Sequence, residues 1–78
     1  MKERVTAVLR ELGFEDDELL FEATADGRVG GYIVSDAFRG ESQLDRQEQL
    51  WASLRARLAA NELDRVTLIL TLTPREVA

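Results

Sequence analysis

The chain has 78 residues, of which 45% are hydrophobic and 32% charged, and its formal net charge is −5 at pH 7. This length suits one small domain spanning residues 1–78, and the composition is that of a folded globular protein rather than a disordered one. The sequence contains no cysteine and no histidine. A disulfide scaffold is therefore excluded, and the commonest general base and the usual zinc and iron–sulfur ligands are missing.

The sequence also bears on location. The N-terminal residues Met1–Arg4 lack the apolar core of a signal peptide, and no apolar run approaches the roughly 20 residues that a membrane helix needs. The negative net charge opposes non-specific binding to nucleic acid and to anionic membranes. We therefore expect a cytoplasmic protein that does not associate with a membrane.

The first predicted element is an amphipathic helix that ends at Gly13. Apolar residues recur with the spacing i, i+3, i+4, i+7 and form one stripe, which consists of Val5, Val8, Leu9 and Leu12. Gly13 can adopt the left-handed conformation that closes a helix, and Phe14 would then fold back onto the stripe. The acidic run 15–18 that follows is predicted to be a solvated connector, because its carboxylates lack the ligand spacing of a calcium loop.

A hairpin is predicted next. Leu19–Thr24 and Val29–Ser35 both resemble strands, and Asp26-Gly27 between them predicts a two-residue type I′ turn, which needs positive φ at both positions. The pair Gly30-Gly31 within the second strand indicates a bulge or a close approach of another backbone.

A long helix is predicted to begin after Ser42, whose hydroxyl suits an N-cap. Its expected buried face consists of Leu44, Trp51, Leu54 and Leu58, with Leu50 beside them. The helix is expected to stop at Asn61.

The last strand is predicted at Val66–Leu72 as a half-buried strand, in which one face consists of Val66, Leu68, Leu70 and Leu72 and the other of Thr67, Ile69 and Thr71. Thr73-Pro74-x-Glu76 then combines an N-cap, a proline at the first helical position and a capping-box Glu, so a short helix should follow. The predicted order is α-β-β-α(α)-β-α, where the bracketed helix allows for a break in the long one. Such a chain should form an α+β two-layer sandwich, with a three-stranded sheet and the helices on one face.

The residues between the second strand and the long helix carry a more specific signal. Residues 34–42 read V-S-D-x-F-x-G-x-S, Arg46 follows, the helix contains Trp51, and the last strand closes with T-P-x-E at residues 73–76. In this order they resemble the BolA family, which usually has Tyr at the Trp51 position. The resemblance implies a fold similar to the type II KH domain, in which the long helix can be kinked near Arg46. It also implies binding to monothiol glutaredoxins, with a role in iron–sulfur handling or in stress-linked regulation.

Two positions depart from that family. BolA-like proteins usually carry a histidine directly after the motif arginine and another at the start of the final strand, where this chain has Gln47 and Arg65. The resemblance therefore predicts no metal and no cofactor here, while the contact with a protein partner can persist. The residues that we predict to bind this partner are Arg65, Asp26, Gly27, Arg28, Val29, Arg46 and Gln47.

Several alternatives stay open. Gly27-Arg28-Val29-Gly30 spells the G-x-x-G loop of KH domains, which predicts a nucleic-acid-binding regulator, although that loop joins two helices in KH domains and here it lies in a hairpin. A protein-interaction module that has lost the family site, as a monomer or a weak homodimer, is a third possibility. For Arg65, the alternative to partner binding is a role at the surface of the domain, in an ion pair with Glu62 or Asp64. Enzymatic activity is not expected, because neither Ser35 nor Ser42 has a base to activate it.

Overall fold

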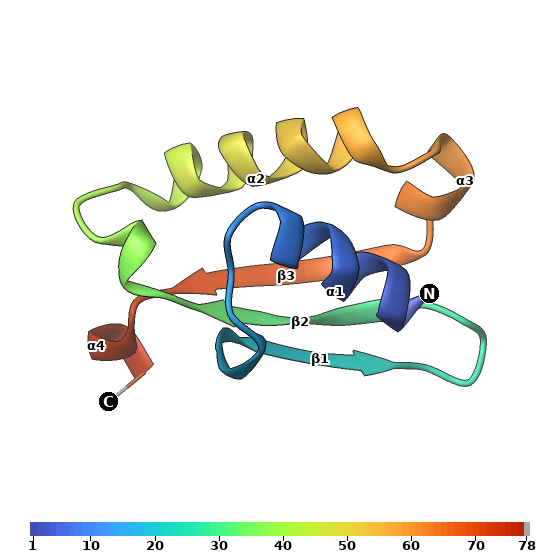
Figure 1. Ribbon diagram of the computed structural model, residues 1–78, viewed down its shortest axis with the longest axis horizontal. Helices are drawn as coiled ribbons and strands as arrows, with labels where there is room; N and C mark the ends of the chain where they lie inside the picture. The colour runs from blue at the N-terminus through green and yellow to red at the C-terminus, as the bar shows by residue number, and fades with distance from the viewer. Residues whose placement is uncertain (78) are drawn as a thin grey trace.

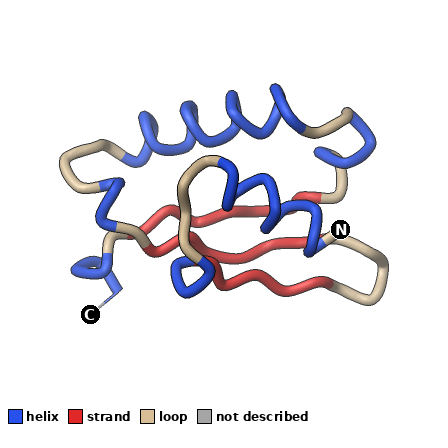
Figure 2. The backbone as a smooth tube through the Cα atoms, viewed as in Figure 1, coloured by secondary structure: helices blue, strands red, loops and turns tan. Residues whose placement is uncertain are grey.

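The computed structural model describes residues 1–77 and has the predicted α+β architecture (Figures 1 and 2). Short 3₁₀ turns at Asp16–Glu18 and Asp36–Phe38 precede β1 and α2, respectively. The helices and strands follow the order α-β-β-α-α-β-α, namely α1 (Lys2–Glu11), β1 (Leu19–Ala23), β2 (Val29–Val34), α2 (Gln43–Arg57), α3 (Ala60–Leu63), β3 (Val66–Leu72) and α4 (Pro74–Val77).

The sheet has the strand order β1-β2-β3, with β1 antiparallel to β2 and β3 parallel to β2. The register shifts between Val29 and Gly30 opposite β3, so the predicted bulge is confirmed. The predicted close approach is confirmed as well, because a Cβ atom on Gly31 would lie 2.1 Å from the carbonyl oxygen of Leu20. Only glycine fits there.

The turn between β1 and β2 differs from the predicted type I′ turn. The Gly27 N–H donates to the Thr24 carbonyl (3.1 Å), and the Thr24 N–H donates to the Arg28 carbonyl (2.8 Å). Gly27 has a φ of 83°, whereas Asp26 does not have a positive φ. The loop is therefore a three-residue connection in which an ordinary turn is followed by a left-handed glycine. The Thr24 hydroxyl, which donates to the Asp26 carboxylate, holds Asp26 in this arrangement.

The core lies between the sheet and the helices α1 and α2. Phe21, Ile33 and Ile69 point into it from the three strands, and α1 and α2 contribute Val5, Val8, Leu9, Leu50 and Leu54. The prediction for the buried face of α2 was partly wrong, because Leu44 is 67% exposed and Trp51 only partly buried. Leu50 and Leu54 carry that face, together with Arg46.

The helix ends show which local signals were sufficient. Gly13 has a φ of 104°, and the N–H groups of Gly13 and Phe14 donate to the carbonyls of Arg10 and Leu9, which confirms the predicted cap. The Ser42 hydroxyl accepts from the Asp45 N–H (3.1 Å), so the predicted N-cap is also confirmed.

Two expectations for the long helix were wrong. It is one continuous helix without a break near Arg46, and it ends at Arg57 rather than at Asn61, which lies inside α3. Within residues 1–77, no helix is long and apolar enough to span a membrane.

Candidate interaction surface

Five of the seven predicted partner-binding residues come together where β2 and β3 begin. The Val29 N–H donates to the Arg65 carbonyl (2.8 Å), which joins the start of β2 to the start of β3. The Arg65 side chain extends over the hairpin loop, because a Cβ atom on Gly27 would lie 2.8 Å from the Arg65 Nη1 atom. The positive φ of Gly27 favours glycine for the turn, and the flexible end of the Arg65 side chain lies over this residue.

A shallow hollow of about 470 Å³ lies between the hairpin loop and the turn that leads from α3 into β3. Two acidic and two basic side chains share it with one amide, and its lining residues are Asp26, Arg28, Asn61, Asp64 and Arg65. All five are exposed. The hollow is therefore a polar surface of mixed charge rather than a deep cleft, and it suits contact with another protein better than the enclosure of a small molecule.

In this surface, Asp26 and Arg28 form an ion pair with each other. Asp26 accepts from the Thr24 hydroxyl, which lowers the pKa of its carboxyl, and the backbone and charge of Arg28 lower it further. The Arg28 Nε atom lies 3.3 Å from the Asp26 carboxylate. Asp26 and Arg28 thus partly neutralise each other, and both remain more than half exposed.

Arg65 is different. The expected ion pair with Glu62 is wrong, because Glu62 pairs with Arg4 (3.3 Å) and accepts from the Ala59 N–H (2.8 Å). The Ala59 N–H, and then the charge of Arg4, lower the pKa of Glu62. Within the 77 residues that the structure describes, the Arg65 guanidinium has no ion pair with Asp64 or with any other acid. It is an exposed cation at the position where the BolA resemblance places a histidine ligand.

Arg46 does not belong to this surface. Its side chain is 5% exposed and lies above the ring of Phe38, with the guanidinium carbon 5.7 Å from the ring centroid. It donates to the carbonyls of Glu41 (3.0 Å) and Thr71 (3.1 Å) and to the Glu76 carboxylate (2.8 and 3.3 Å). Its donors are directed inward, so Arg46 does not lie on an exposed surface.

Glu76 links this buried arginine to the end of the chain. Its carboxylate accepts from the Thr73 N–H (2.7 Å), and its own N–H donates to the Thr73 hydroxyl (3.3 Å), so the predicted capping box is confirmed. The hydrogen bonds from Arg46 and then from the Thr73 backbone lower the pKa of Glu76 to about 2. The T-P-x-E closure therefore ties α4 to the start of α2, a role that the sequence reading missed.

Gln47 lies beside Arg46, at the far half of β3 from Arg65. Its amide nitrogen donates to the Ile69 carbonyl (2.9 Å) and to the Thr71 hydroxyl (3.1 Å), while its amide oxygen accepts from the Trp51 indole N–H (3.0 Å). The Thr71 hydroxyl in turn donates to Gln43 (2.9 Å). Gln47 thus joins α2 to β3, and several residues of strand separate it from the five predicted contact residues at the start of β2 and β3.

In residues 1–77, no group of three or more acidic side chains is placed to hold a metal ion. A scan against protein-family models gave no match for this chain, and neither did searches of the curated proteins and of the solved structures. The resemblance to the BolA family therefore stays a prediction based on the residues that carry it.

Proposed function

We propose that this protein is a BolA-like, non-enzymatic adaptor that acts in the cytoplasm and docks on a monothiol glutaredoxin through the Arg65 surface. This surface consists of Arg65 together with Asp26–Val29. The observation that carries the proposal is the exposed guanidinium of Arg65, which extends over the Gly27 turn without an acidic partner in the described chain. An uncompensated cation beside a mixed-charge rim is a feature that a partner's carboxylate can complement.

The proposed docking does not include ligation of an iron–sulfur cluster. A cluster iron takes thiolate or, in some centres, imidazole ligands. A guanidinium carries hydrogen-bond donors only and has no lone pair to offer to a metal, so Arg65 cannot replace an imidazole. The amide of Gln47 is already occupied by Ile69, Thr71 and Trp51. The role in iron–sulfur handling or in the stress response would thus be exerted through protein contact alone.

The test is to mix the protein with a monothiol glutaredoxin and a cluster source and to record visible absorbance and circular dichroism. We expect no spectrum other than that of the glutaredoxin alone. Arg65→His should create a new, heterodimeric cluster spectrum, because the imidazole would stand at the start of β3. A stable mixed cluster with the unmodified protein, lost in Arg65→Ala, would overturn the argument about ligands.

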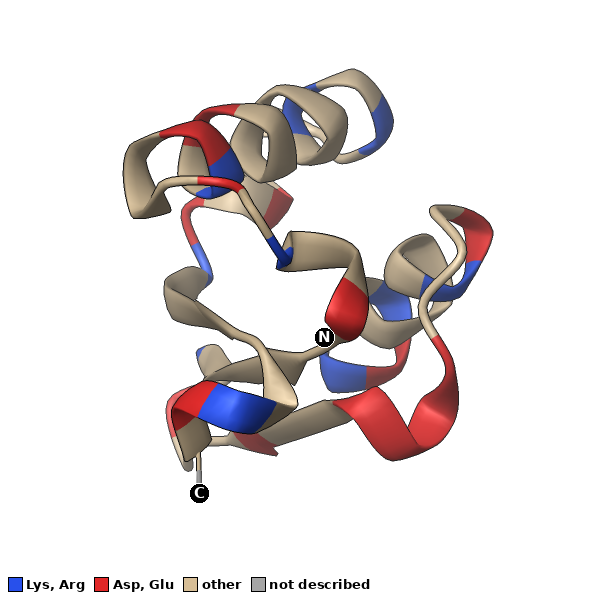
Figure 3. Cartoon of the chain, turned by 90° about the vertical axis from the view of Figure 1, so that its left-hand side faces the viewer, with Lys and Arg blue, Asp and Glu red and all other residues tan. Residues whose placement is uncertain are grey.

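The nucleic-acid-binding alternative receives less support. The G-x-x-G sequence of residues 27–30 lies in a hairpin turn and at the start of a strand, and Arg46 is buried. Basic and acidic segments are interspersed along the chain, with an acidic stretch in the connector before β1 (Figure 3). A continuous basic stripe, which nucleic-acid binding favours, is therefore not formed in this view. The third alternative, an interaction module for another protein, would use the same Arg65 surface.

A further inference from the structure

The two edges of the sheet are protected to different degrees. At the β3 edge, the side chains of Gln43 and Gln47 donate to the carbonyls of Thr71 (2.7 Å) and Ile69 (2.9 Å), so part of this edge is already covered. Strand β1 pairs only with β2. In residues 1–77, no side chain hydrogen-bonds to its backbone, and its sequence, Leu-Leu-Phe-Glu-Ala, contains neither the proline nor the lysine that commonly blocks an edge strand.

We propose that the open edge of β1 pairs antiparallel with β1 of a second copy, about a two-fold axis at Phe21. This proposal is independent of the Arg65 surface. The resulting dimer would contain a continuous six-stranded sheet, in which each copy supplies the same strand to an interface that is identical on both sides.

The hydrogen-bond alternation of the hairpin determines which groups are available. Because the Thr24 N–H donates to the Arg28 carbonyl across the hairpin, the antiparallel alternation directs the backbone groups of Phe21 and Ala23 away from β2. Leu19 offers only its carbonyl, since its N–H donates to Asp16. A two-fold axis at Phe21 places Phe21 opposite its copy and Ala23 opposite Leu19. It thereby forms about four backbone hydrogen bonds and leaves the pairing with β2 intact.

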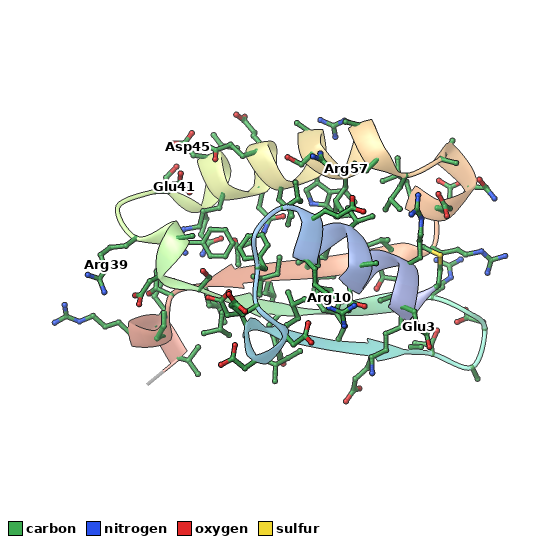
Figure 4. The ribbon with its side chains drawn as sticks, in the orientation of Figure 1. Glu3, Arg10, Arg39, Glu41, Asp45 and Arg57 are labelled. Atoms are coloured by element: carbon green, nitrogen blue, oxygen red, sulfur yellow. The ribbon has the colours of Figure 1, made fainter. Side chains whose placement is uncertain are left out.

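The charges on α1 suit the same axis. Glu3, Thr6 and Arg10 are spaced by three and four residues, so they share one helix face, and they line a groove together with Leu19 of β1. The side chain of Glu3 is 94% exposed and that of Arg10 is 54% exposed. Figure 4 labels both side chains along α1. Lys2 and Asp16 line the same groove, and Arg10 pairs with Asp16 within one copy. The stripe therefore has Glu3 beside Lys2 at one end, Thr6 in the middle and the Arg10–Asp16 pair at the other end.

The lengths of the two elements place this stripe correctly for self-pairing. Helix α1 packs on β1 and runs in the opposite direction (Figure 1). Its ten residues extend about 15 Å, and the five residues of β1 extend about 16 Å. A two-fold axis at Phe21 therefore passes close to Thr6. It brings Glu3 of each copy toward Arg10 of the other, where Glu3 would share the guanidinium with Asp16 in two symmetric contacts.

The test is sedimentation velocity from about 10 µM to about 1 mM protein. We expect a concentration-dependent dimer. Ala23→Pro should abolish it, because proline removes an N–H that faces the open edge and no bond to β2. Glu3→Lys and Arg10→Glu should each raise the dissociation constant about tenfold, and the double charge swap should restore it. Glu48→Lys changes an exposed acid on α2. It is the matched control and should leave the dissociation constant unchanged.

Circular dichroism of each variant shows whether it is folded, and the charge swap provides a test that does not depend on Ala23→Pro. A protein that stays monomeric at the highest concentration would overturn the proposal. So would a dimer that tolerates both Ala23→Pro and Glu3→Lys. The outer sheet face also exposes Leu20, Tyr32, Leu68 and Leu70. A dimer that Leu68→Lys abolishes, while Ala23→Pro does not, would therefore assign the interface to that face and contradict edge pairing.

Discussion

Arg46→Ala should be among the most destabilising substitutions in this chain. It removes two hydrogen bonds from a charged donor to backbone carbonyls, those of Glu41 and Thr71, and the ion pair with Glu76. Bonds to charged groups each contribute about 1.5–3 kcal/mol. The two bonds to carbonyls together contribute about 3–6 kcal/mol. Because the Thr71 carbonyl keeps its bond from Gln43, we expect a loss at the lower end of this range, about 3 kcal/mol. A domain of this size has a total stability of about 4–12 kcal/mol.

Urea unfolding at pH 7 measures this loss. With a slope of about 1 kcal/mol per molar, the midpoint should fall by about 3 M at unchanged slope. Arg55→Ala is the matched control, because Arg55 is an exposed arginine on the same helix. It should change the free energy of unfolding by less than about 0.5 kcal/mol. If Arg46→Ala costs under about 1 kcal/mol, the buried network does not hold α2, β3 and α4 together.

The same network predicts a dependence on pH. The pKa of Glu76 is lowered to about 2 in the folded protein from the ordinary value of 4.5. Its contribution to stability is therefore complete above pH 4.5 and is lost as the pH falls toward 2. Glu76→Gln should abolish this contribution, so the difference in stability between the two proteins should shrink across that interval. A constant difference down to pH 2 would show that Glu76 is not coupled to Arg46.

Three further predictions follow from the fold. Ser42→Ala should cost about 0.5–2 kcal/mol through the lost N-cap of α2, and an unchanged urea midpoint would show that Ser42 does not cap. Leu54→Ala should cost about 2–5 kcal/mol, because Leu54 is fully buried, whereas Leu44→Ala should cost less than about 0.5 kcal/mol; equal losses would contradict the observed face of α2. In fluorescence anisotropy at physiological salt, nucleic acid should bind no tighter than about 10⁻⁴–10⁻⁶ M, and a salt-resistant nanomolar complex would favour the KH-like alternative.

Local signals in the sequence were enough to predict most of the fold. The strand Val66–Leu72 was predicted with the bounds that the structure has, but the prediction of its buried face was wrong. Ile69 and Thr71 are buried, whereas Leu68 and Leu70 are exposed. The caps at Gly13 and Ser42 depend only on neighbouring backbone, and the close approach at Gly31 could be inferred from an isolated glycine pair. The strand bounds and the two caps are fixed within a few residues of the chain, so pattern reasoning is sufficient for them.

Features that depend on distant partners were not predicted. The buried face of α2 includes an arginine, which a hydrophobic pattern assigns to solvent, and the acid that pairs with it lies thirty residues away at Glu76. The same applies to Glu62, which pairs with Arg4 from the other end of the chain. The turn at Asp26-Gly27 was mistaken for a two-residue loop, because the hydroxyl of Thr24 and the carboxylate of Asp26 stabilise a longer one.

The candidate surface was predicted in part. The start of β3 and the hairpin loop do meet, since parallel pairing of β2 with β3 brings Arg65 beside Val29. Arg46 and Gln47 were assigned to the same surface from their positions in a motif, and a motif does not show which way a side chain points. Both are directed into contacts between α2 and β3.

The most direct test of the proposed function is the binding of the protein to a monothiol glutaredoxin without a cluster, measured by isothermal titration calorimetry. We predict a complex with a dissociation constant in the micromolar range, about −8 kcal/mol. Arg65→Glu should weaken it at least about tenfold, and the matched control Arg75→Glu, which changes an exposed arginine on α4, should leave it unchanged. No detectable binding, or equal binding of the Arg65→Glu variant and the unmodified protein, would contradict docking through the Arg65 surface.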